Sequence, residues 1–335
     1  MSKLYENESG ILVSHENYIN NVYKSMNGDP NVYRLNPGLF NIFSPYKKSK
    51  SKRKSEHSEC EIETNFYKFI RDQNVQDFLD NCENETNQTA IEVADNIQKN
   101  LPKDILDLIG GNKGPSTSRS INESKYLFPE NSSFFSKDVN EIEKHLTGKK
   151  FDFILLDPPW WNKYIRRKRK ASSDAYQMMY NYDLKNLPVE QLLKKDGLIA
   201  VWCTNSEQNY NALLTDIFPH WKVNFVSKWY WMKITKKGEP ICNFSDPPGK
   251  QPFERIIFAH RTRSEPLPEN GKLIVSIPSA IHSHKPPLAE VLQQYLPNDP
   301  ECLEVFARYL VPGWTSYGNE AIKLQHESLF VPHQK

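Results

Sequence analysis

The stretch FDFILLDPPW, which runs from Phe151 to Trp160, carries the strongest structural signal in the chain. Its first six residues form a short apolar run, typical of a parallel strand that is buried on both faces. The run ends at Asp157, and two prolines follow, which cannot extend a strand ladder because they lack a backbone N–H group. We therefore predict a central strand with a rigid turn at its carboxyl end.

Further apolar runs follow this stretch and alternate with helical segments. Strand candidates lie at residues 198–201, 223–231, 255–259, 273–277 and 303–307, and helices are expected at 189–195 and 287–296. Strands that alternate with helices predict an α/β sheet, in which ligands bind at the carboxyl ends of the strands. The turn at Asp157 is therefore expected to lie at a functional edge of the sheet.

The tetrapeptide Asp157-Pro158-Pro159-Trp160 has two interpretations. In the first, it is only a turn after a strand, with the aspartate as a turn residue and the tryptophan in the core. In the second, a carboxylate and a carbonyl on a rigid Pro-Pro backbone hold both N–H groups of an adenine amine and localise its lone pair toward an electrophile. The aromatic residue that follows can stack on the base. The position at a strand end favours the second interpretation.

Two more blocks follow in order: His284-Lys285-Pro286, and LEVFARYLVPGWTSYGNE from Leu303 to Glu320. With these blocks the chain resembles the DPPW-type adenine-N6 methyltransferases, the MT-A seventy family, over residues 138–325. The closing block and KWYWMKI from Lys228 are most similar to the branch called methyltransferase-like protein 4. The resemblance implies a circularly permuted Rossmann-like methyltransferase sheet that uses S-adenosyl-L-methionine and releases S-adenosyl-L-homocysteine.

The resemblance also implies roles for individual residues. Asp157, within the catalytic group Asp157, Pro158, Pro159 and Trp160, would contact both the target amine and the amino group of S-adenosylmethionine. Lys285 would pair with the methionine carboxylate of the cofactor. The other implied cofactor-binding residues are Asp138, Val139, Arg308, Asn319 and Glu320. No metal ion is implied.

A basic loop follows the DPPW motif, and tyrosines 176, 180 and 182 come after it. A run of charge is often only a solvated loop. Beside a base-modifying site, however, basic and aromatic side chains suit phosphate contacts and stacking on a single strand or a splayed-out nucleotide. The residues expected to contact nucleic acid are Trp161, Lys163, Arg166, Arg167, Lys168, Arg169, Lys250 and Phe253. For the last two, a loop that merely shapes the sheet edge is the alternative.

The first part of the chain differs from the rest, because all seven tryptophans follow residue 150. Apolar residues at helical spacing between residues 61 and 108 predict two or three amphipathic helices. The loop at 110–122 is a plausible boundary. We expect a smaller, mostly helical accessory domain at 1–122 and an S-adenosylmethionine-dependent methyltransferase domain at 123–335. A basic run at 47–54 is either a solvated linker or a nuclear-import or nucleic-acid patch.

The composition excludes several classes of protein. The 335 residues include 43 basic and 41 acidic ones, with a formal net charge of +2, which excludes a histone-like polycation and an acidic disordered chain. The five cysteines form no CxxC pair, so neither a disulfide framework nor a zinc site is expected. No apolar run of about 18 residues and no signal peptide is recognisable. We expect a soluble protein of the nucleus, with the cytoplasm as a second location.

The DPPW motif and the family resemblance together imply an S-adenosylmethionine-dependent N6-adenine methyltransferase that acts on RNA, and we expect it to act as a monomer. The resemblance points to an internal 2′-O-methyladenosine in a U2-type small nuclear RNA, with m6Am as the product. A DNA N6-adenine methyltransferase is one alternative, because phosphate and stacking contacts serve both nucleic acids. A non-catalytic RNA-binding subunit is another, but decay of the site should then show as a broken DPPW or a lost lysine. Residues 1–110 could also form a protein-interaction module unrelated to catalysis.

Overall fold

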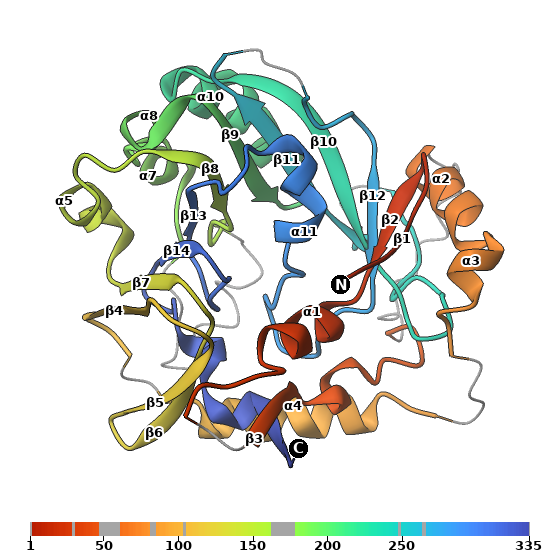
Figure 1. Cartoon of the computed structure of the whole chain (residues 1–335). Coiled ribbons are helices and arrows are strands. Elements are labelled where there is room, and N and C mark those ends of the chain that lie inside the picture. The colour runs from red at the N-terminus through yellow and green to blue at the C-terminus, as the bar shows by residue number, and fades with distance from the viewer. Residues whose placement is uncertain are drawn as a thin grey trace.

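The computed structural model describes residues 2–28, 31–46, 61–80, 85–102, 105–161, 178–246, 249–262 and 266–334. These residues form an α/β structure around an 11-stranded sheet, in which the strand order is β1-β2-β12-β10-β11-β9-β8-β13-β14-β7-β4 (Figure 1). Its strands are β1 (Lys3–Glu6), β2 (Gly10–Val13), β4 (Leu108–Asn112), β7 (Ser132–Ser136), β8 (Phe151–Leu156), β9 (Leu193–Cys203), β10 (Asn224–Lys233), β11 (Phe253–His260), β12 (Leu273–Ser276), β13 (Cys302–Val305) and β14 (Trp314–Tyr317). The predicted α/β class and its large, mostly parallel sheet are confirmed.

The direction of the strands determines which chain segments meet at one edge. Strands β9, β8, β13, β14 and β7 pair in parallel, and so do β10, β12 and β2. Between these two groups, β11 is antiparallel to both of its neighbours. The carboxyl ends of the parallel strands therefore lie at the same edge as the amino end of β11.

The sheet is buried on both faces, which explains why its central strands are apolar at successive positions. On β8, Phe153 and Leu155 pack into one core cluster, and Ile154 and Leu156 pack into another. The second cluster is covered by short helices on the 139–220 side of the chain: η2 (Val139–Glu141), α5 (Ile142–His145), α7 (Asn181–Lys185), α8 (Val189–Leu192), α9 (Glu207–Ala212), the π-helical turn η3 (Leu213–Ile217) and α10 (Phe218–His220).

The first cluster is covered by both ends of the chain. Its helices are α1 (His15–Val22), the 3-10 turn η1 (Pro37–Phe40), α4 (Gln88–Asn100), α11 (Ala289–Leu292) and the turns η4 (Gln293–Tyr295), η5 (Lys323–Gln325) and η6 (Glu327–Leu329). A small sheet pairs β3 (Asn31–Leu35) with β15 (Phe330–Gln334), and another pairs β5 (Thr117–Ile121) with β6 (Ser124–Phe128). The N-terminal residues therefore pack directly on the central sheet.

The helices α2 (Glu61–Ile70) and α3 (Gln73–Gln76), together with α4, confirm the amphipathic helices predicted between residues 61 and 108. Phe66 and Phe69 of α2 pack against β2, β10 and β12. Strands β1, β2 and β4 also belong to the central sheet, at its two ends. An accessory domain that ends at residue 122 stays a prediction, but segments from both sides of that position share one sheet.

The predicted helix at 287–296 is shorter than its apolar spacing indicated. Only Ala289–Leu292 is α-helical, and a 3-10 turn continues it to Tyr295. Pro286 and Pro287 lack the N–H groups that an earlier helical turn would donate. Among the described residues, no helix is long and apolar enough to cross a lipid bilayer.

Candidate active site

The implied cofactor-binding residues lie at the ends of four adjacent parallel strands. Asp157 follows β8, Arg308 comes three residues after β13, Glu320 follows β14, and Asp138 follows β7. Since these strands are neighbours in the sheet and run in the same direction, their carboxyl ends form a continuous row. Such a row is where α/β sheets bind their ligands.

A chain of alternating charges surrounds the end of β8. Lys285 Nζ lies 3.3 Å from Asp157 Oδ1 and 2.7 Å from Glu254 Oε2, and Glu254 also pairs with Lys233. The Lys285 ammonium also lies 5.1 Å from the centre of the Trp202 ring. The side chains of Asp157 and Lys285 are only 16% and 12% exposed, so water screens this pair weakly.

The pKa values reflect both burial and pairing. Burial alone would lower the pKa of Lys285, but Asp157 and Glu254 outweigh it and raise that pKa to about 12. Burial would raise the pKa of Glu254, yet the two lysines hold it well below its usual range. For Asp157, burial prevails over the attraction of Lys285, and its pKa is raised. A carboxylate that is costly to keep ionised is thus held beside a permanent cation.

The two proline carbonyls are fixed by the turn that follows. Pro158 O accepts from Trp160 N at 2.8 Å, and Pro159 O accepts from Met179 N at 2.9 Å. Each carbonyl oxygen has a second lone pair that can accept another donor. Trp160 is 8% exposed and its Nε1 donates to Trp202 O at 2.8 Å, so its indole is part of the core.

The far end of the row combines an ion pair with a capped turn. Arg308 Nε lies 3.1 Å from Glu320 Oε2, and Arg308 Nη1 donates to His282 O at 3.3 Å. Asp138 caps η2 by accepting from Asn140 N, while its own carbonyl accepts from Tyr317 Oη. Val139 is buried, whereas Asp138 and Asn319 are exposed. The structure therefore places all the implied cofactor residues on one edge, together with Lys285.

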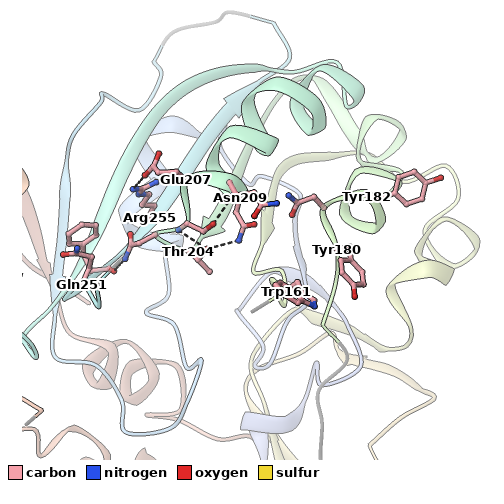
Figure 2. Close-up of a pocket in the computed structure, with 14 residues that line it drawn as sticks. Trp161, Tyr180, Tyr182, Thr204, Glu207, Asn209, Gln251 and Arg255 are labelled. Carbon is pink, nitrogen blue, oxygen red and sulfur yellow. Dashed lines mark hydrogen bonds and ion pairs between the residues drawn. The ribbon is translucent and has the colours of Figure 1, made fainter. Parts of the chain in front are cut away.

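A cavity of about 1060 Å³ lies on the other side of the turn (Figure 2). Aromatic side chains line it: Trp161, Phe253, Tyr180 and Tyr182, the last two 60% and 70% exposed. The rings of Trp161 and Tyr180 are 6.3 Å apart at an interplanar angle of 21°. Exposed rings beside a cavity provide stacking surfaces for flat ligands.

The remaining lining of the cavity is polar. Arg255 pairs with Glu207, Asn209 Nδ2 donates to Thr204 Oγ1 at 3.0 Å, and Asn205 Nδ2 donates to Phe253 O at 2.7 Å. Arg255 keeps two buried N–H donors, at Nε and Nη1, that have no partner among the described residues. The cavity therefore offers amide groups, a guanidinium and aromatic faces together.

The structure places only some of the residues expected to contact nucleic acid at this cavity. Trp161 and Phe253 both line the cavity. Lys250 instead holds its ammonium 4.9 Å from the centre of the Tyr46 ring, and only its neighbours Gly249 and Gln251 line the cavity. The basic residues Lys163, Arg166, Arg167, Lys168 and Arg169 lie outside the described residues.

Sequence reasoning missed Glu254, Lys233 and Arg255, which come from β10 and β11. The apolar run in FERIIFAH predicts a strand from residue 255, and its pattern assigns no role to the charged residues at its amino end. Two charged residues at the start of an apolar strand were the available signal. This signal has a meaning only in the folded sheet, where β11 runs antiparallel to its neighbours and its amino end therefore lies at the site.

Comparison with known proteins agrees with this geometry. The N(6)-adenine-specific methyltransferase METTL4 of Mus musculus is 38% identical over 237 residues, which cover 67% of this chain and 49% of that protein. The DNA N6-methyl methyltransferase of Caenorhabditis elegans is 35% identical, over 65% of this chain and 59% of that protein. The N6-methyladenosine RNA methyltransferase MTA1 of Cryphonectria parasitica is 36% identical, over 63% and 64%.

The chain thus spans about half the length of the mouse protein. The model of the MT-A70 family matches residues 151–320, which include the DPPW turn, Lys285 and the closing block. The predicted family is therefore confirmed. Because the match covers more than half of the 335 residues of this chain, the chain belongs to the MT-A70 family.

Proposed function

We propose that this protein is an S-adenosylmethionine-dependent N6-adenine methyltransferase that acts on RNA. The observation that carries the proposal is the DPPW turn, whose carboxylate lies 3.3 Å from a buried lysine at the carboxyl edge of the sheet. An acidic acceptor, fixed carbonyls and a cation are assembled there. These are the groups needed to hold an amine beside a zwitterionic cofactor.

The residues present fit S-adenosylmethionine. The Lys285 ammonium suits its carboxylate, and Asp157 suits its amino group. Arg308, Asn319 and Glu320 would hold the ribose hydroxyls, and Asp138 and Val139 the adenine. When bound, the cofactor supplies an electrophilic methyl group. Lys285 contributes by remaining protonated, because its pKa is raised to about 12 by the two carboxylates that outweigh its burial.

Asp157 and the Pro158 or Pro159 carbonyl would accept from the two N–H groups of the target adenine. This contact localises the amine lone pair without a covalent enzyme intermediate, so catalysis relies on positioning. Trp160 keeps the turn rigid through its hydrogen bond to Trp202 O. The flanking nucleotides would lie in the aromatic cavity, where Trp161, Tyr180 and Phe253 offer stacking surfaces.

RNA is the proposed substrate, and an internal 2′-O-methyladenosine in a small nuclear RNA is the proposed target. The similarity to METTL4 supports the adenine-N6 chemistry. Relatives whose names specify RNA and DNA are similar to this chain at comparable identity, so DNA is the second candidate substrate. The basic residues at 163–170 would bind the phosphates of either nucleic acid.

A non-catalytic subunit is less well supported, because the DPPW turn and Lys285 are intact and in contact. We further propose that the protein acts as a monomer in the nucleus, with the cytoplasm as a second location. The basic run at 47–54 would serve nuclear import.

The test is incubation with S-adenosylmethionine and matched RNA and DNA oligomers, followed by mass spectrometry of the nucleosides. One RNA should carry an internal 2′-O-methyladenosine, and its twin an unmodified adenosine. We expect N6-methylation of the 2′-O-methylated RNA first and of DNA least. A preference for the DNA oligomer would show that DNA, and not RNA, is the substrate. Calorimetric binding of the cofactor without methylation of any oligomer would favour the non-catalytic subunit.

A further inference from the structure

The loop that carries Lys285 is held on one side by the N-terminal segment of the chain, through Ser2, His15 and Leu39. Strand β2 pairs in parallel with β12 at the end of the sheet, so both strands end at the same edge. The chain then enters α1 after β2, and the lysine loop, residues 277–288, after β12. Two segments more than 260 residues apart in sequence therefore leave the sheet side by side.

A pair of buried histidines joins the two segments. The rings of His15, at the start of α1, and His284 have centroids 4.1 Å apart at an angle of 67°. Both side chains are almost completely buried, at 3% and 4% exposure. His284 directly precedes Lys285, whose side chain instead contacts Asp157 and Glu254. One residue thus faces the N-terminal segment, and the next faces the site.

Other contacts surround the same loop. Ala280 N donates to Leu39 O at 2.8 Å, and Ser2 N and Oγ donate to Glu290 Oε2 at 2.6 and 2.8 Å, just beyond the loop. On its other side, the loop accepts a hydrogen bond from Arg308 at His282 O. The N-terminal segment therefore contacts the loop before and at the histidine, and contacts α11 just after the loop.

The loop needs external support because its backbone is strained. Ser283 has a φ of 60°, a left-handed conformation that residues other than glycine rarely adopt. Such conformations persist where the surrounding structure enforces them. The next residue along the chain is His284, which is fixed between His15 and Tyr309, with its ring centroid 5.6 Å from that of the tyrosine.

We propose that His15 is a positioning residue for the cofactor site: it packs on His284, fixes the strained turn at Ser283, and so holds the Lys285 ammonium between Asp157 and Glu254. The N-terminal segment is then part of the cofactor site rather than a module unrelated to catalysis. This inference rests on the proposed role of Lys285 toward the cofactor carboxylate.

The test compares two ligands that differ in the amino-acid group to which that carboxylate belongs. S-adenosylhomocysteine carries the amino-acid group, whereas 5′-methylthioadenosine lacks it and keeps the adenosine. Calorimetric titrations of the full chain should use His15→Ala, His15→Leu and His15→Phe, with Lys285→Ala as the reference. Tyr23→Leu is the control, since Tyr23 is a buried ring that directly follows α1 and packs on Phe330.

We expect the alanine and leucine variants of His15 to bind S-adenosylhomocysteine roughly tenfold more weakly, because small misplacements of a charged group are costly. Binding of 5′-methylthioadenosine should stay within twofold. His15→Phe should restore most of the affinity, because it keeps an aromatic ring against His284. Tyr23→Leu should lower the melting temperature without changing the affinity ratio of the two ligands. The leucine variant also covers the case in which His15→Ala fails to fold.

Equal weakening of both ligands in the His15 variants, or no weakening of either, would overturn the inference while Lys285→Ala still discriminates between them. If Lys285→Ala itself weakens both ligands equally, the cofactor role of Lys285 is wrong, and the inference falls with it. The two failures are therefore distinguishable in one series of titrations.

Discussion

Two regions meet at the end of β8, and they differ in how their polar groups are satisfied. On one side, Asp157, Lys285, Glu254 and Lys233 form a paired chain of buried charges. On the other side, a cavity of about 1060 Å³ exposes Tyr180 and Tyr182 to solvent. The charged groups of the first region pair with one another, whereas the second region presents exposed aromatic surfaces.

The difference fits what the proposed function requires each region to bind. A zwitterionic cofactor is recognised by fixed charges, which act strongly only where water is excluded. A nucleic-acid strand is recognised by stacking and phosphate contacts, which tolerate an open and adjustable surface. Substitutions in the charged region should therefore change chemistry, and those that leave a buried charge without its partner should also lower stability. Substitutions in the cavity should change substrate affinity alone.

The largest effect is expected from Asp157→Asn, which keeps the shape of the side chain but removes the carboxylate. Turnover should fall by about a hundredfold to a thousandfold or more, because a group that acts on the transition state is lost. The fold should persist, since Lys285 still pairs with Glu254. Single-turnover methylation and circular dichroism measure the two quantities. Asp152→Asn, at the other end of β8, is the matched control, and equal activity of the two variants would contradict the proposed mechanism.

Lys285→Met should reduce both cofactor binding and stability. Without the cation, Asp157 loses its ion pair in a buried site while Glu254 keeps Lys233, and leaving a buried charge without its partner typically costs roughly 3–5 kcal/mol. Burial already raises the pKa of Asp157, and the loss of Lys285 should raise it further, so the variant should be least destabilised at acidic pH and lose stability as pH rises. Urea unfolding at pH 5 and pH 8 tests this sign. Lys272→Met is the control, because Lys272 pairs with Glu6 away from the site. A loss of stability independent of pH would show that packing, rather than charge, dominates.

The double variant Tyr180→Ala/Tyr182→Ala addresses the cavity. Removing a stacked aromatic side chain costs about 1–3 kcal/mol for each base, so the KM for an RNA oligomer should rise about tenfold or more. The calorimetric affinity for S-adenosylhomocysteine should not change. Phe225→Ala is the matched control, since Phe225 is 41% exposed at the amino end of β10, away from the cavity. An unchanged KM would show that these tyrosines do not bind the RNA, and the basic residues at 163–170 would then be the next candidates for substrate binding.

The smallest effect is expected from Glu304→Gln, beneath the charged region on β13. Burial, and next the charge of Asp157, raise the pKa of Glu304 to about 8, so its carboxyl is protonated in the fold at neutral pH. Because this pKa is raised above the unfolded value, the wild type should lose stability as pH rises through about 8. The glutamine variant imitates the protonated form and should melt a few degrees higher near pH 9, with little difference at pH 4. Parallel melting curves across this range would show that Glu304 is not buried as described.

The position of the site was predictable because its main signal is local. The FDFILL run predicts a strand buried on both faces, and the two prolines end it at Asp157 through their missing N–H groups. The family blocks add Lys285 and Arg308 because each lies within a recognisable motif. Helices α2 and α4 followed from apolar spacing alone.

The partners of these residues were not predictable, because they depend on strand direction and order. Glu254 contacts Lys285 only because β11 is antiparallel to both of its neighbours. No local sequence pattern encodes that strand direction. His15 contacts His284 only because β2 pairs with β12, a strand that is far from it in sequence. Local sequence is sufficient for a strand, a turn or a motif, whose residues are adjacent. Contacts between distant segments, and the pKa values that follow from their burial, arise only when the whole sheet has assembled.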